Sequence, residues 1–206
     1  MFLKRLEIGC LAANCYIIAD EDTKLAAVID PGGDGADIAA LCSQEGLQVK
    51  YIINTHGHAD HIMGNADLKA ATEAQVLVHA GDAEMLTCHH KSLASLVGVN
   101  DALVPPDRLL IDGEQLSLGK LELKIIHTPG HTLGGISIAV EKCLFTGDTL
   151  FAESIGRTDF PGGSFNQLMQ SVKTRLFTYP DETKVYPGHG PKTTIKWEKD
   201  HNPFLK

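Results

Sequence analysis

The residues best suited to chemistry lie in one short stretch, residues 55–61, with the sequence Thr-His-Gly-His-Ala-Asp-His. Four metal-binding side chains fall there within six positions, directly after the apolar run at residues 51–53. Side chains two positions apart in an extended segment project to the same side, so His56 and His58 are able to bind one metal ion together. Asp60 and His61 lie beyond the expected turn and face a second position. The stretch therefore predicts half of a two-metal hydrolytic centre.

Three more ligand-type residues follow at wide spacing, each in a loop beside an apolar run. His131 lies in His-Thr-Pro-Gly-His-Thr, Asp148 in Phe-Thr-Gly-Asp-Thr and His189 in Tyr-Pro-Gly-His-Gly. Loops of this kind at strand ends can converge on one edge of a sheet. A carboxylate has two oxygens and is able to bridge two cations, which makes Asp148 the predicted link between the metals.

The predicted ligand set is divided between the two metals. We assign the first metal to His56, His58 and His131. We assign the second metal to Asp60, His61 and His189. The carboxylates Asp60 and Asp148 are also the predicted catalytic residues.

This donor set predicts two divalent metal ions, with zinc preferred and iron or manganese as alternatives. Imidazole with carboxylate suits all three ions, and the absence of cysteine ligands disfavours a structural zinc site. Zinc lowers the pKa of bound water to about 7, so hydroxide becomes available at neutral pH. The expected chemistry is therefore hydrolysis by attack of a metal-bound hydroxide.

Other polar residues have more than one interpretation. Asp30 ends a predicted strand and is able to accept a proton from a ligand imidazole, or simply to form the turn. Thr55, Thr128 and Thr132 are candidates for similar support or for local backbone capping. Arg157 is a candidate clamp for an anionic substrate, but we favour a structural pair with Asp159.

The remaining histidines are expected to be ordinary surface or core residues, because none belongs to a ligand-rich motif. They are His79, His89, His90, His127 and His201. His127 is the least secure member, since it lies near His131.

Composition limits the class of substrate. The 206 residues carry a formal charge of −8 and show no basic stripe, which argues against nucleic acid and favours a small-molecule substrate. No apolar run approaches the about 18 residues of a membrane span. The N-terminus has no apolar signal-peptide region, and the five cysteines show no paired spacing, so we expect a cytoplasmic protein with free thiols. The oligomeric state stays open.

The pattern of apolar runs predicts an α/β protein. Strands are expected at residues 2–8, 15–19, 25–29, 49–53, 75–78, 115–118, 121–126, 136–140, 143–145 and 184–186. Helices are expected between residue 38 and Gly46 and at residues 65–73, 165–176 and 193–200, with a further candidate at 82–87. This order predicts one domain, residues 1–206, built of two similar halves in a four-layer αββα sandwich. Residues 80–106 are expected to form one wall of the active-site mouth.

The four motifs, in this order, resemble those of the metallo-β-lactamase-fold hydrolases, and most closely the short glyoxalase-II-like branch. The likeness runs from about Cys15 to His201. It implies the αββα sandwich, the seven metal ligands assigned above, and hydrolysis of a small thioester such as S-lactoylglutathione. Larger glyoxalase II enzymes carry a C-terminal helical domain that binds glutathione. This chain ends too soon after His189 for such a domain, so we expect glutathione to be recognised by other groups or only weakly.

A related family gives the main alternative. The segment Gly-Arg-Thr-Asp-Phe at residues 156–160 is similar to one in persulfide dioxygenases. That likeness implies a single iron held by His56, His131 and Asp148. We rank this second, because the following Pro-Gly-Gly resembles the short hydrolases. A nuclease is disfavoured by the acidic charge, a β-lactamase by the absent export signal, and a non-catalytic metal-binding role by the open two-metal site.

Overall fold

The first half of the chain builds one six-stranded sheet. The computed structural model describes residues 1–9, 11–96 and 102–206. The sheet runs in the order β1 (Phe2–Ile8), β2 (Ala13–Ala19), β3 (Leu25–Ile29), β4 (Gln48–Ile53), β5 (Gln75–His79) and β6 (Arg108–Leu110). The first three strands pair in antiparallel fashion, and β3 to β6 are parallel. The carboxyl ends of β3, β4 and β5 therefore meet at one edge.

The second half builds a second six-stranded sheet. Its order is β14 (Thr193–Thr194), β13 (Lys184–Pro187), β10 (Cys143–Gly147), β9 (Ile136–Val140), β8 (Leu121–His127) and β7 (Gln115–Leu118). Strands β8, β10 and β13 run in the same direction, because β9 is antiparallel to β8 and β10 while β13 is parallel to β10. A small hairpin, β11 (Leu150–Phe151) and β12 (Ser154–Ile155), follows β10.

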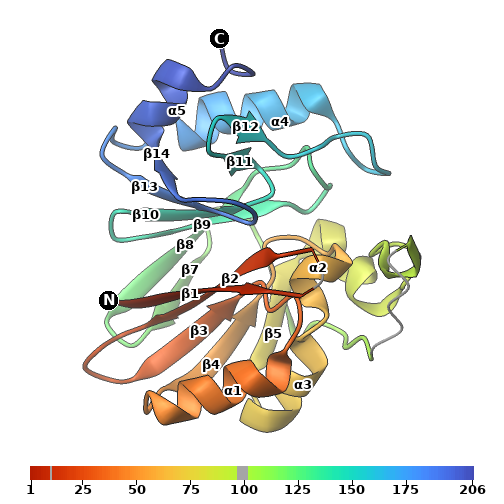
Figure 1. The fold of residues 1–206 in the computed structure, drawn as a ribbon, viewed down its shortest axis with the longest axis vertical. Helices are drawn as coiled ribbons and strands as arrows, with labels where there is room; N and C mark the ends of the chain where they lie inside the picture. The colour runs from red at the N-terminus through yellow and green to blue at the C-terminus, as the bar shows by residue number, and fades with distance from the viewer. Residues whose placement is uncertain (10, 97–101) are drawn as a thin grey trace.

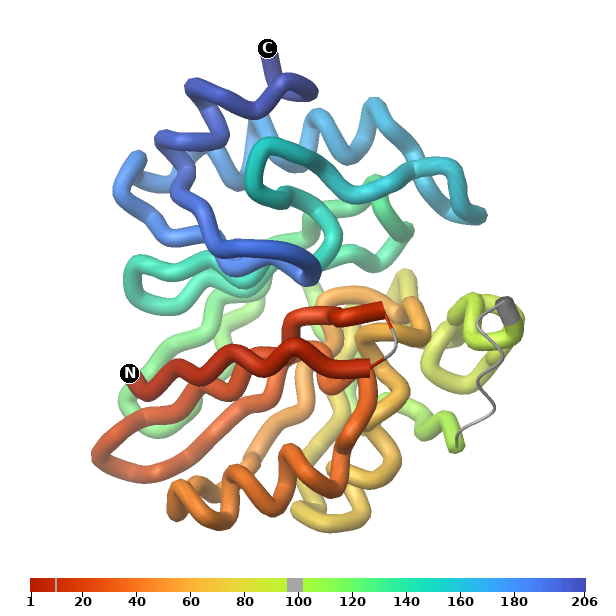
Figure 2. Tube along the Cα trace, viewed as in Figure 1, coloured from red at the N-terminus to blue at the C-terminus, as the bar shows by residue number. Residues whose placement is uncertain are grey.

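The two sheets pack face to face, and helices cover their outer faces (Figure 1). Helices α1 (Gly35–Gln44) and α3 (Asn65–Thr72) lie on the first sheet, while α4 (Phe165–Ser171) and α5 (Ile195–His201) lie on the second. The tube in Figure 2 shows the same four layers. This arrangement confirms the predicted αββα sandwich.

Aromatic side chains fill the space between the sheets near the later motifs. Tyr16 of β2 packs edge-on against Phe145 and Tyr186, at ring centroid distances of 5.1 and 5.7 Å. Phe145 and Tyr186 stack on each other at 5.2 Å. All three rings are buried in the same core cluster. The ends of β10 and β13, which lead to Asp148 and His189, are thereby fixed against β2.

Several short elements were not predicted. Helix α2 (Ala59–Ile62) is a single turn inside the metal motif, and β6 and β14 are too short to show alternation. The candidate helix at residues 82–87 is the 3-10 helix η1 (Ala80–Thr87), and a second 3-10 turn, η2, covers Ala94–Leu96. Part of the 80–106 segment, residues 97–101, lies outside the described residues.

The helix predicted over residues 165–176 is present, but only its first part is α-helical. The α-helical part ends at Ser171, and a π-helical turn, η3 (Val172–Leu176), continues it. The Phe177 N–H donates to the Val172 carbonyl five residues back, which widens this turn. Apolar spacing did not show the difference, because Val172 and Leu176 are buried in either form.

The cysteines within the described residues are free thiols: Cys15 and Cys42 are buried, and Cys88 and Cys143 are half-buried. Cys10 lies outside the described residues. Over the parts of the chain that the structure describes, no helix is both long enough and apolar enough to cross a bilayer.

Candidate metal centre

The structure brings all seven predicted ligands to one rim of the sandwich. Each lies in the loop or turn after the carboxyl end of a strand. Four ligands, His56, His58, Asp60 and His61, follow β4, while His131 follows β8, Asp148 follows β10 and His189 follows β13. Parallel strands present their carboxyl ends at the same edge, which explains why ligands so distant in sequence meet. His58 is extended and stands at the N-cap of α2, whose first turn carries Asp60 and His61.

The ligand atoms form three groups in which all members lie within 4.8 Å of one another. The groups are His56, His58 and His131; Asp60, His61 and His189; and His56, His61 and Asp148. The first two groups coincide with the predicted division of the ligands between two metals. The third group combines Asp148 with His56 from the first group and His61 from the second.

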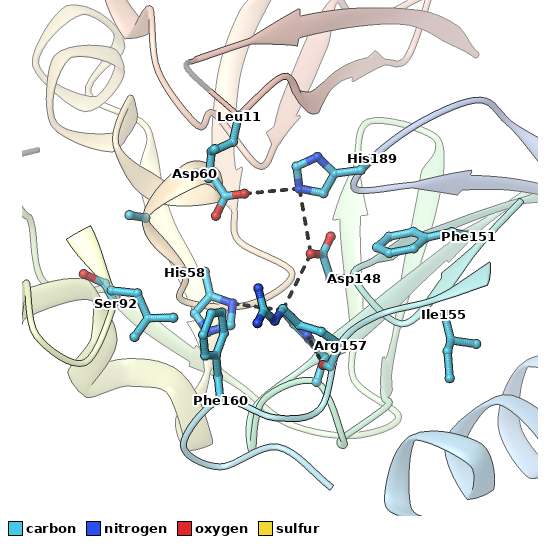
Figure 3. Close-up of a pocket in the computed structure, with 13 residues that line it drawn as sticks. Leu11, His58, Asp60, Ser92, Asp148, Phe151, Ile155, Arg157, Phe160 and His189 are labelled. Atoms are coloured by element: carbon cyan, nitrogen blue, oxygen red, sulfur yellow. Dashed lines mark hydrogen bonds and ion pairs between the residues drawn. The ribbon is translucent and has the colours of Figure 1, made fainter. Parts of the chain in front are cut away.

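Asp148 lies between the two predicted metal positions. One of its oxygens, Oδ1, is 3.5 Å from His61 Nε2, and the other, Oδ2, is 3.6 Å from His131 Nε2 and 3.8 Å from His189 Nε2. His189 Nε2 is also 3.1 Å from Asp60 Oδ2. Figure 3 shows Asp60, His189 and Asp148 facing one another at the cavity floor. A carboxylate so placed is able to contact cations on both sides.

Two imidazoles of the three-histidine group, those of His56 and His58, are neutral at neutral pH. Burial, followed by the charge of His61 and then of His131, lowers the pKa of His56 well below its ordinary value. Burial and His131 lower the pKa of His58 to about 3. His58 Nδ1 lies 2.9 Å from His131 Nε2. The imidazoles of His56 and His58 are therefore free of the extra proton that would block metal binding.

The other group is richer in carboxylate and behaves in the opposite way. Burial acts to lower the pKa of His61, but Asp60, Asp148 and Asp30 outweigh it and raise this pKa to about 10. For His189 burial is again outweighed, chiefly by the hydrogen bond to Asp60, and its pKa is raised. A metal ion must displace protons from this group to bind.

Asp30 holds the metal motif to the end of β3. Its Oδ1 accepts the Thr55 N–H at 2.6 Å, and its Oδ2 accepts the Thr55 hydroxyl at 2.6 Å. The same Oδ2 lies 3.1 Å from His61 Nδ1. This contact favours the tautomer of His61 that presents Nε2 to the metal position. The predicted supporting role of Asp30 therefore has a geometric basis.

The threonines differ in what they contact. Thr55 Oγ1 is 3.2 Å from His56 Nδ1. Thr132 donates to the carboxylate of Asp82. The Thr128 hydroxyl bonds with the hydroxyls of Ser137 and Thr149, so it contacts no ligand through these bonds.

Asn14 is a supporting residue that the sequence did not reveal. Its backbone N–H donates to the Gly188 carbonyl at 2.7 Å, and its side-chain amide donates to the carbonyls of Pro187 and Gly190, both at 2.9 Å. The three carbonyls lie before and after His189 in the sequence, so these bonds fix the His189 loop to β2. The available signal was weak, since Asn14 belongs to no motif and is more than 170 residues away from its partners.

His131 is oriented by the loop that carries Arg157. The Arg157 carbonyl lies 2.7 Å from His131 Nδ1 and can only accept, so Nδ1 carries the proton and Nε2 presents its lone pair to the centre. The Arg157 side chain pairs with Asp159 through two bonds of 2.8 Å, as we favoured. It also lines the cavity and packs 3.8 Å from the Phe160 ring centre.

The remaining histidines lie apart from the three ligand groups, with two stacked pairs among them. His79 and His127 stack on each other at 4.1 Å, and His201 stacks on Trp197 at 4.0 Å. His90 lines a separate cavity.

A cavity of about 560 Å³ opens directly in front of the centre. Leu11 forms its upper wall in Figure 3, and Arg157 and Phe160 form its lower wall. Ser92 and Leu93 add a further wall, in agreement with the expectation for residues 80–106. Five of the seven candidate ligands line this cavity and are therefore accessible to a small molecule: His58, Asp60, His131, Asp148 and His189.

The family model described as "Metallo-beta-lactamase superfamily" matches residues 8–189. The chain belongs to the metallo-beta-lactamase superfamily. Among curated relatives of this superfamily member, the hydroxyacylglutathione hydrolase GloC of Haemophilus influenzae is 35% identical over 209 residues. That alignment covers 100% of this chain and 98% of the relative.

Solved structures of the superfamily are also similar over nearly the whole chain. The crystal structure of BLEG-1 B3 metallo-beta-lactamase has a TM-score of 0.94 and 35% identity, with 100% of both chains covered. ETHE1 from Myxococcus xanthus has a TM-score of 0.84 and 33% identity, covering 98% of this chain and 84% of its own. TTHA1623, solved in a di-iron-bound form, has a TM-score of 0.86 and 34% identity, covering 98% and 100%.

The site of this superfamily member fits divalent cations by a test that is independent of these likenesses. His56 Nε2, His61 Nε2 and Asp148 Oδ1 are buried without a hydrogen-bond partner. An unpaired buried polar atom costs about 1–3 kcal/mol, so three in one place call for a ligand. Imidazole nitrogen and carboxylate oxygen are donors for zinc, iron and manganese.

Proposed function

We propose that the protein is a metal-dependent hydrolase of small thioesters, of the class of S-lactoylglutathione. The observation that carries the proposal is the position of Asp148 between two ligand groups at the floor of an open cavity. The similarity to GloC supports a hydroxyacylglutathione as the substrate. Two cations in this site are part of the proposal, with zinc preferred and iron or manganese as alternatives.

The chain's own residues position the metals and the substrate. When bound, the cations polarise a carbonyl and lower the pKa of a coordinated water to about 7. Asp60 and Asp148 line the cavity, and each lies close to a ligand imidazole. Their carboxylates would hold the cations and orient the coordinated water toward the substrate. A thiolate leaves readily, since thiols have a pKa of about 8.5, so no general acid is required.

Arg157 is the proposed contact for an anionic thiol portion. We expect Arg157→Ala to raise the KM for a glutathione thioester about tenfold with little change in kcat, because a hydrogen bond to a charged group is lost. A neutral thioester should be hydrolysed as before. Asp159→Ala should lower the KM for the anionic substrate, since Asp159 holds the guanidinium through two bonds. If Arg157→Ala had the same KM as the unchanged protein for the glutathione thioester, as well as for the neutral one, Arg157 would have a purely structural role.

The function is tested by assaying zinc-, iron- and manganese-loaded protein on a panel of substrates. Thiol release from S-lactoylglutathione, abolished by chelation and restored by metal, is the expected result. A β-lactam belongs in the panel because of the similarity to BLEG-1. Metal-loaded protein that hydrolyses no thioester would refute the proposal.

Persulfide dioxygenase activity is the second candidate, favoured by the similarity to ETHE1. The three residues implied for a single iron lie together: His56 falls in a ligand group with each of the others, and His131 Nε2 is 3.6 Å from Asp148 Oδ2. Oxygen uptake by iron-loaded protein with glutathione persulfide would support this function. Thiol release from a thioester, with no oxygen uptake when glutathione persulfide is added, would support the hydrolase.

A further inference from the structure

Asp82 is a buried carboxylate close to the metal centre but not part of it. It lies in the first turn of η1, just after β5, and is 1% exposed. It is absent from the three ligand groups and from the walls of the cavity in front of them. A carboxylate is seldom buried without a specific set of hydrogen-bond donors, so its partners are informative.

Those partners belong to the two loops that carry the three-histidine group. Asp82 Oδ2 accepts the backbone N–H of Gly57 at 3.1 Å and the hydroxyl of Thr132 at 2.7 Å. Asp82 Oδ1 accepts the backbone N–H of Gly134 at 2.7 Å. Gly57 stands between His56 and His58, and Thr132 directly follows His131. One carboxylate therefore bonds to both ligand-bearing loops.

The backbones at these contacts approach so closely that only glycine fits. A Cβ on Gly134 would lie 2.5 Å from the Asp82 nitrogen, and a Cβ on Gly81 would lie 2.9 Å from the Gly134 Cα. A Cβ on Gly57 would lie 2.4 Å from the Met85 Cβ. The start of η1 is thus seated directly on both loops, and the three hydrogen bonds of Asp82 have little freedom to lengthen.

We propose that Asp82 is a positioning residue that fixes the loop of His56 and His58 relative to the loop of His131. It brings the nitrogens of His58 and His131, 73 residues apart in sequence, to 2.9 Å. It does so through the backbone and Thr132 and touches no ligand atom. The proposal concerns metal binding, so it rests on the ligand assignment and not on the thioester substrate.

The three donors require an acceptor on both oxygens, which a carboxylate provides. An asparagine has the same shape but offers one carbonyl oxygen and one amide group that donates. In either orientation its amide would face a backbone N–H, of Gly57 or of Gly134. Asp82→Asn should therefore separate the loops without removing volume.

The test is the affinity for zinc, measured by competition with a chromophoric chelator. Asp82→Asn should weaken the binding of one metal equivalent by about 10- to 100-fold, the range for lost partners of ligating residues. The absorption spectrum of the cobalt-substituted protein should change as well, since the geometry of the histidines is altered. Thr132→Val removes one of the three bonds and should weaken zinc by a smaller factor; it serves if Asp82→Asn does not fold.

Asp20→Asn is the matched control. Asp20 is also buried and accepts three hydrogen bonds, from Lys120, Thr23 and Asp22. It directly follows the carboxyl end of β2, whereas Asn14, which bonds to the His189 loop, lies at the opposite end of that strand. The Asp20→Asn substitution should lower the thermal stability of the metal-free protein and leave its zinc affinity and the cobalt spectrum unchanged. Zinc affinity within about threefold of the unchanged protein in a folded Asp82→Asn variant would overturn the proposal. An equal loss of affinity in Asp20→Asn would also overturn it, because the effect would then reflect general stability.

Discussion

Replacing Asp148 by alanine is expected to lower the zinc content from about two equivalents to about one or less, and to reduce kcat/KM about a thousandfold. Asp148 is close to both ligand groups, so its loss removes a donor from each metal position. It also removes one of the two carboxylates that offset the charge of the cations. Metal analysis after dialysis and steady-state assays of thioester hydrolysis give the two readouts.

Asp200→Ala is the control for this change. Asp200 is an exposed residue of α5 that pairs with Lys196 one turn away, and such pairs contribute little to stability. It should keep full metal content and activity. If Asp148→Ala also retained its metal stoichiometry and its rate, the bridging role would be wrong. Loss of metal with an unchanged rate would contradict the metal-dependent mechanism.

The meeting of the seven candidate ligands at one rim could be predicted from the sequence because the signals are local. Each motif couples a metal-binding residue type to the end of an apolar strand, as Asp148 is coupled to β10. Ligands at strand ends converge once the strands share a sheet edge, whatever the details of packing. The αββα layers could be predicted for a similar reason, since periodicity reports which face of each element is buried.

Two residues that hold the ligand loops in place, Asn14 and Asp82, could not be predicted, because they act through contacts between distant segments. Asn14 reaches the His189 loop from β2, and Asp82 reaches Gly57 and Gly134 from η1. Nothing near these residues in sequence marks their partners. Asp82 follows a strand end, as Asp30 does, so the signal that singled out Asp30 applied to both. The π-helical turn of η3 was missed because burial alone does not distinguish it from an α-helix.

The two ligand groups differ in charge environment, and this predicts an unequal response to acid. We expect one metal equivalent to leave before the other as the pH falls from about 8 to about 5.5. His61, with a pKa raised to about 10, holds a proton in the metal-free protein at neutral pH, so protons compete with the second metal throughout this range. The pKa of His189 is raised as well, which adds to this competition. The pKa of His58 is lowered to about 3 and that of His56 lies well below its ordinary value, so these two ligands meet that competition only in stronger acid. Equilibrium dialysis across this range, with metal analysis at each pH, measures the loss of each equivalent.

The assignment of the acid-sensitive equivalent follows from a single variant. His189→Ala removes a ligand of the carboxylate-rich group and leaves the three-histidine group intact. It should bind about one equivalent at about pH 8 and keep it over the range in which the unchanged protein loses its first metal. Simultaneous loss of both equivalents from the unchanged protein would contradict the prediction, because it would mean that Asp148 couples the two positions more strongly than their different proton affinities separate them.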